Sequence, residues 1–82
     1  MANSERIKLQ GRKAELKQEI TDLKTRGANH IITVRDLIDP YEDFTALEVE
    51  RAEHAMISLK YLVTQAQEKE SMLQKIKKDL GE

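Results

Sequence analysis

The chain has 82 residues, of which 35% are charged, a net charge of -1 and no cysteine. A chain this short forms a single domain with a small core, and without cysteine it has neither a disulfide nor a thiolate zinc site. The low net charge separates it from highly charged disordered proteins, and no segment resembles a signal peptide or a membrane span. We therefore expect a cytoplasmic protein.

The first helix is predicted at residues 4–26. Its apolar side chains recur every seven residues, at Leu9, Leu16 and Leu23, which is typical of an amphipathic helix that packs along one stripe. Glycine is common immediately after the end of a helix, so Gly27 predicts where this one stops.

Residues 27–44 form the predicted connector, which is unusually apolar for a loop. We expect one short helical turn over residues 33–38, ended by Pro40, because the residue before a proline avoids the helical conformation. The alternative is a short extended run over residues 31–34, which β-branched side chains favour. In either case the apolar side chains require burial within the chain or against a partner; they are Ile31, Ile32, Val34, Leu37 and Ile38.

The second helix is predicted at residues 45–80. Thr45 and Glu48 have the spacing of a capping box, and Phe44 and Val49 that of a hydrophobic staple. Two apolar rows with seven-residue spacing follow, as in a coiled coil. The first row is Ala52, Leu59, Ala66, Leu73 and Leu80; the second is Ala55, Leu62, Lys69 and Ile76.

The second helix is apolar over a wider stripe in its first half than in its second half. Val49, Met56 and Val63 form a third row there, and a wide stripe indicates contact with more than one element. Because the predicted first helix is the shorter one, it leaves residues 45–57 without a partner helix. These residues and the connector therefore form the predicted partner interface, which consists of Ile31, Ile32, Val34, Leu37, Ile38, Val49 and Met56.

These patterns predict an all-α protein, an antiparallel two-helix coiled-coil hairpin with a short helical turn in its connector. The apolar rows also predict association with a second copy, most simply a homodimer that forms a helical bundle. Another protein is expected as a further partner.

The sequence contains no catalytic arrangement of residues. Glu50 lies one helical turn before His54, but two ligands without a third do not make a metal site, and we interpret them as an exposed pair. The chain has no cysteine nucleophile and no glycine-rich phosphate loop. We therefore expect neither an enzyme, nor a bound metal, nor a cofactor.

Charge is distributed unevenly along the chain. Residues 1–34 carry seven basic and four acidic side chains, whereas residues 35–54 carry two and seven. A basic face on the first helix supports an alternative, the binding of RNA or DNA. The architecture is similar in outline to small helical hairpins that dimerise into four-helix bundles and bind RNA. The residues of this candidate face are Arg6, Lys8, Arg12, Lys13 and Lys17.

The function that these observations favour is that of a non-enzymatic protein-protein interaction module. Adaptors, assembly chaperones and inhibitors all use such helical surfaces. Small charged hairpins are common among phage and mobile-element proteins, so we expect an origin of that kind. A membrane-surface role is not favoured, because a strongly basic face with large apolar anchors is missing.

Overall fold

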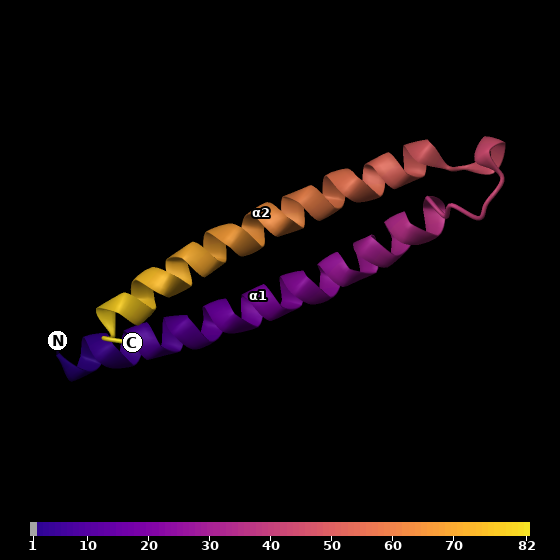
Figure 1. Cartoon of the computed structure of the whole chain (residues 1–82). Coiled ribbons are helices and arrows are strands. Elements are labelled where there is room, and N and C mark those ends of the chain that lie inside the picture. Colours follow the sequence, from indigo (N-terminus) through magenta and orange to yellow (C-terminus); the bar gives the residue numbers. More distant parts are fainter. Residues whose placement is uncertain (1) are drawn as a thin grey trace.

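A computed structural model describes residues 2–82 as two long helices joined by a short connector. Helix α1 spans Asn3–Leu37, the 3-10 turn η1 spans Phe44–Ala46, and helix α2 spans Val49–Asp79. The chain reverses direction between the helices, so both termini lie at one end and the connector at the other (Figure 1). The predicted all-α antiparallel hairpin is confirmed, with dimensions of 63 × 17 × 14 Å.

Helix α1 is longer than predicted. The expected end at Arg26 is wrong, because α1 continues through Gly27 to Leu37. Half-buried His30 and Leu37 extend the leucine row by two further steps of seven residues, so the helix keeps an inward-facing stripe. Gly27 is buried on that stripe, where an added Cβ would lie 3.7 Å from Cδ1 of Leu59. Packing against α2 thus outweighs the ~1 kcal/mol that a glycine costs inside a helix.

The apolar part of the predicted connector is therefore helical. Residues 33–37 form the last turn of α1 rather than a separate helical turn, and the alternative extended run over residues 31–34 is wrong as well. The Thr33 hydroxyl donates a hydrogen bond to the Asn29 carbonyl at 3.0 Å, a contact that the helical backbone supplies. The short helical turn of the connector exists, but it lies at Phe44–Ala46.

Two aspartates organise the connector. The Asp39 carboxylate accepts a hydrogen bond from the Tyr41 N–H at 2.9 Å, and the Asp43 carboxylate accepts one from the Thr45 N–H at 3.2 Å. Aspartate forms such turns because its side chain replaces a backbone acceptor. Pro40 lies in the first of these turns, beyond the end of α1, as the sequence predicts.

Helix α2 begins at Val49, later than the predicted start at Thr45. The capping box does not form, because Asp43 already caps Thr45 and the Glu48 carboxylate contacts Arg51 at 3.0 Å. Phe44 is exposed, so the expected staple is also wrong. The Thr45 N–H thus donates its hydrogen bond to the Asp43 carboxylate, two residues earlier, and the capping box is not formed.

The end of α2 agrees with the prediction. Gly81 has φ 78°, the left-handed conformation that glycine adopts readily. The Gly81 N–H donates to the Lys78 carbonyl at 3.0 Å, and the Glu82 N–H donates to the Lys77 carbonyl at 2.8 Å. This pair of bonds is a Schellman motif, which satisfies carbonyls that the helix leaves unpaired.

The core is a narrow seam between the two helices. Leu16, Ile20 and Leu73 form its buried cluster, and Ile76 packs against it. The two predicted rows of α2 face α1, and Leu16 packs in the same cluster as Leu73. The buried apolar residues are Leu16, Ile20, Leu23, Ala52, Ala55, Leu62, Leu73 and Leu80.

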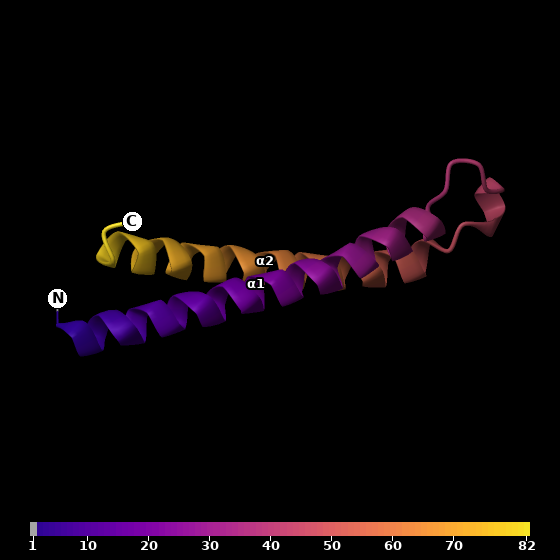
Figure 2. The same cartoon turned by 90° about the horizontal axis from the view of Figure 1, so that it is seen from below.

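The two helices match in length, since α1 has 35 residues and α2 has 31. At about 1.5 Å per residue they are ~52 and ~46 Å long, so α1 reaches almost the whole of α2. The expectation that residues 45–57 lack a partner helix is therefore wrong, and Ala52 and Ala55 are buried there. Figure 2 shows that the helices cross: α1 lies below α2 near the termini and above it near the connector.

Candidate protein interface

A hairpin of two helices buries only the seam and leaves two long flanks open, one on each side. One flank is apolar in the half nearer the connector. Its side chains recur every seven residues on both helices and are 42–58% exposed. We call this surface the apolar flank; it consists of Ile31 on α1, Ile38 at the end of α1, and Val49, Met56 and Val63 on α2.

The two helices contribute to the apolar flank together. Ile31 and Val63 line one hollow of about 210 Å³, whose floor includes Gly27 and Leu59. Lys24 is the only charged residue around this hollow. Because Gly27 has no side chain, the helices leave room there for an apolar side chain from outside the hairpin.

The predicted interface residues separate into three groups, on the apolar flank, on the inner face of α1 and, for Ile32 alone, on the outer face of α1. Ile31, Ile38, Val49 and Met56 lie on the apolar flank and are exposed. Val34 and Leu37 are half-buried on the inner face of α1, so they belong mainly to the hairpin's own packing.

Ile32 is exposed, but it is two residues away from both inward-facing His30 and Val34. At about 100° per residue it therefore points away from the seam. Val63, by contrast, lies one step of seven residues after Met56, but the predicted interface does not include it. The seven-residue spacing of the third row, Val49, Met56 and Val63, is the sequence signal that identifies Val63 as an interface residue.

The same side of the hairpin is basic nearer the termini. A second hollow, of about 460 Å³, is lined there by Lys17, Lys24 and Lys77, with Glu70 as its one acidic residue. We call it the cationic hollow. Its apolar floor includes Leu73. Along one side of the molecule, an apolar half thus continues into a cationic half.

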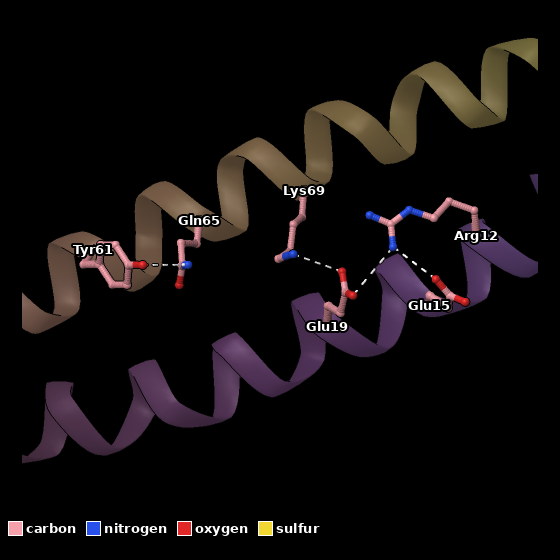
Figure 3. A network of polar contacts seen from close by, with 6 residues as sticks. All are labelled: Arg12, Glu15, Glu19, Tyr61, Gln65 and Lys69. Atoms are coloured by element: carbon pink, nitrogen blue, oxygen red, sulfur yellow. Dashed lines mark hydrogen bonds and ion pairs between the residues drawn. The ribbon is translucent and has the colours of Figure 1, made fainter.

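The opposite side carries the polar network between the helices (Figure 3). Lys69 occupies a seam position and donates to Glu19 at 3.0 Å, while Arg12 lies 3.6 Å from the same carboxylate. The hydrogen bond from Lys69 and the positive charges of Lys69 and Arg12 hold the pKa of Glu19 below its ordinary value of 4.5, although desolvation opposes this shift. Arg12 also contacts Glu15 at 3.1 Å.

The residues of the predicted nucleic-acid face do not form one strip. Arg12 is engaged with two carboxylates, and Lys13 is half-buried and pairs with Glu82 near the C-terminus. The hydrogen bond from Lys13 lowers the pKa of Glu82. Lys17 lines the cationic hollow on the other side of the hairpin. Arg6 and Lys8 are exposed near the N-terminus.

The two histidines line the same hollow between the helices. His30 is half-buried on the inner face of α1, and it lines one open hollow together with His54 and Arg51. Across residues 2–82, no group of three or more histidine, aspartate or glutamate side chains is placed to hold a metal ion. Glu50 does not line that hollow.

The connector presents two aromatic side chains to solvent. Tyr41 is 95% exposed and Phe44 is 84% exposed. Acidic residues surround them, namely Asp39, Glu42 and Asp43. The end of the hairpin therefore combines aromatic surface with negative charge.

In the described part of the chain, neither helix has an apolar stretch of the length that crossing a bilayer requires. Comparison with protein-family models, with curated proteins and with solved structures gives no match.

Proposed function

We propose that this protein is a non-enzymatic protein-protein interaction module that acts through the surface of a helical bundle, as adaptors, assembly chaperones and inhibitors do. The observation that carries the proposal is the apolar flank. Five large apolar side chains from two helices stand about half exposed in one row along each helix, where a folded monomer ordinarily keeps polar residues. An additional helix laid along this flank removes them from water.

Helix-to-helix recognition fits the spacing of these residues. Val49, Met56 and Val63 recur every seven residues, which is the period with which one helix presents side chains to another in a coiled coil. Small residues beside Val63, at Gly27, Ala28 and Ala66, allow a close approach. We extend the same packing to the hairpin itself, with its helices paired as a coiled coil.

The test compares the wild type and two variants by affinity capture from cells that express the protein. Val63→Glu puts a charge on the apolar flank, whereas Ile32→Glu puts the same charge on the outer face of α1. We expect the wild type and Ile32→Glu to retain the same specific protein and Val63→Glu to lose it, with helicity by circular dichroism unchanged in both. Equal capture by all three would contradict the proposal, and so would retention of nucleic acid alone.

A further inference from the structure

The hairpin exposes more surface than a folded chain of its mass. Its accessible surface is 6423 Å², whereas a compact monomer of 9.5 kDa exposes about 5,000 Å². The excess is ~1,400 Å², which is more than the about 800 Å² that each partner in a standard protein interface buries. The open flank is therefore large enough to be covered by one further layer of helices.

The central part of the apolar flank, around Ile31 and Val63, is self-complementary. A two-fold axis through Ile31, perpendicular to the helices, lays the flank of a second copy on the first in antiparallel orientation. Ile31 then meets its own counterpart, and Ile38, seven residues after it, faces Lys24, seven residues before it. Apolar rows of both copies overlap around the hollow beside Gly27. Such a two-fold interface closes on itself and produces a dimer rather than a filament.

The same arrangement joins opposite charges. Lys17 lies fourteen residues before Ile31, or ~21 Å along the helix, and the connector extends a similar distance on the other side. The acidic connector of one copy therefore reaches the cationic hollow of the other. The hollow has an apolar floor for Tyr41 or Phe44 and lysines for the carboxylates of Glu42 and its neighbours.

From this double match we propose that the apolar flank binds a second copy of the same chain, in an antiparallel four-helix dimer in which each acidic connector docks in the partner's cationic hollow. The inference rests on the proposed function, because it names the partner of the same surface. A parallel dimer joins the same apolar rows but sets two connectors against each other. Residues 35–54 carry seven acidic and two basic side chains in each copy, so that arrangement is repulsive.

Sedimentation equilibrium at micromolar concentration is the first test. The wild type is expected at twice its chain mass, Met56→Glu at the chain mass, and Ile32→Glu again as a dimer. Far-UV circular dichroism of each variant reports whether the hairpin itself is intact. A wild-type monomer overturns the inference, and so does a dimer that Met56→Glu leaves unchanged.

Charge reversal tests the orientation without introducing a charge into the apolar flank. Lys17→Glu and Glu42→Lys are each expected to weaken the dimer, and the double variant to restore it, because each contact then regains opposite charges. The expected effect is a several-fold change in dimer dissociation constant that shrinks as salt is added. A double variant as weak as the two single variants rules out this orientation.

Disulfide trapping tests the axis directly, since the natural chain has no cysteine. Under mild oxidation Ile31→Cys is expected to form a covalent dimer much faster than Ile32→Cys, its neighbour on the outer face. Equal rates contradict an axis at Ile31. If the wild type is monomeric but Val63→Glu still loses a protein that the wild type captures, the self-association is wrong while the proposed interaction function stands. If the wild type is monomeric and Val63→Glu captures the same proteins as the wild type, both proposals are wrong.

Discussion

The Nζ of Lys69 lies 3.0 Å from Oε2 of Glu19, and this ion pair joins the helices at the one position in the two seam rows of α2 that is not apolar. Lys69 extends its stem along the seam while its charged end reaches the flank, as long basic side chains do at apolar surfaces. Glu19 in turn lies beside Arg12 (Figure 3). The pair therefore favours this alignment of α1 against α2.

Reversing this pair tests its role in alignment. Lys69→Glu is expected to lower the melting temperature, because it sets two carboxylates against each other, and Glu19→Lys to do the same beside Lys69 and Arg12. The double variant regains opposite charges and should recover most of the loss. Circular dichroism melts of the four proteins measure the coupling. Additive losses in the double variant would show that the contact contributes nothing.

Acid weakens the hairpin through the same carboxylate. Lys69 and Arg12 hold the pKa of Glu19 below its ordinary value of 4.5, so folding favours its ionised form. This contribution is fully present above the ordinary pKa and is lost as the pH falls through the lowered one. Urea unfolding at a series of pH values should show stability declining below about pH 4.5, with a shallower decline in Glu19→Gln. Identical slopes in both proteins would contradict the assignment.

Glu82 should contribute in the same pH range. The hydrogen bond from Lys13 lowers its pKa, and the charges of Lys17 and Lys77 add to the shift. Glu82→Gln is therefore expected to remove a further part of the acid-dependent loss. Since Glu82 and Glu19 lie in separate networks, the effects of the two substitutions should add.

The sequence predicts the hairpin well where apolar side chains mark the seam. Every residue expected in the two rows of α2, from Ala52 to Leu80, is buried or half-buried. In α1 the rows continue past Leu23 through Gly27, which is small, and His30, which is polar. A prediction from apolar periodicity alone therefore ends the helix too early. Their place in the seam depends on the close approach of α2, which a single helix does not encode.

The apolar flank was predicted in part for a similar reason. The third row of α2 identifies Val49 and Met56, and the crowded connector identifies Ile31 and Ile38. Which members face outward depends on whether residues 27–37 are loop or helix. Only the helix separates outward-facing Ile31 from inward-facing Val34.

Truncation of the most buried side chain should be the most damaging single change in the seam. Leu16 is fully buried, and Leu16→Ala leaves a cavity that the two helices do not easily close. Such substitutions cost about 2–5 kcal/mol, a large share of the stability of so small a domain. Ile7→Ala, at a side chain that is 71% exposed, should stay within about 0.5 kcal/mol. Urea unfolding of both variants checks the contrast, and equal effects would contradict the seam.

Replacement by alanine should raise the stability of the protein at two of the three glycines and lower it at the third. At Gly11 an added Cβ meets no atom within 4 Å, and at Gly27 it meets only Leu59 at an ordinary contact distance. Each substitution to alanine is therefore expected to stabilise its helix by about 1 kcal/mol. Gly81→Ala should destabilise by roughly 1–2 kcal/mol, because its positive φ is strained for any residue with a Cβ. Thermal melts of the three variants decide the case: if Gly27→Ala melts below the wild type, the helices approach more closely at this point than the structure shows.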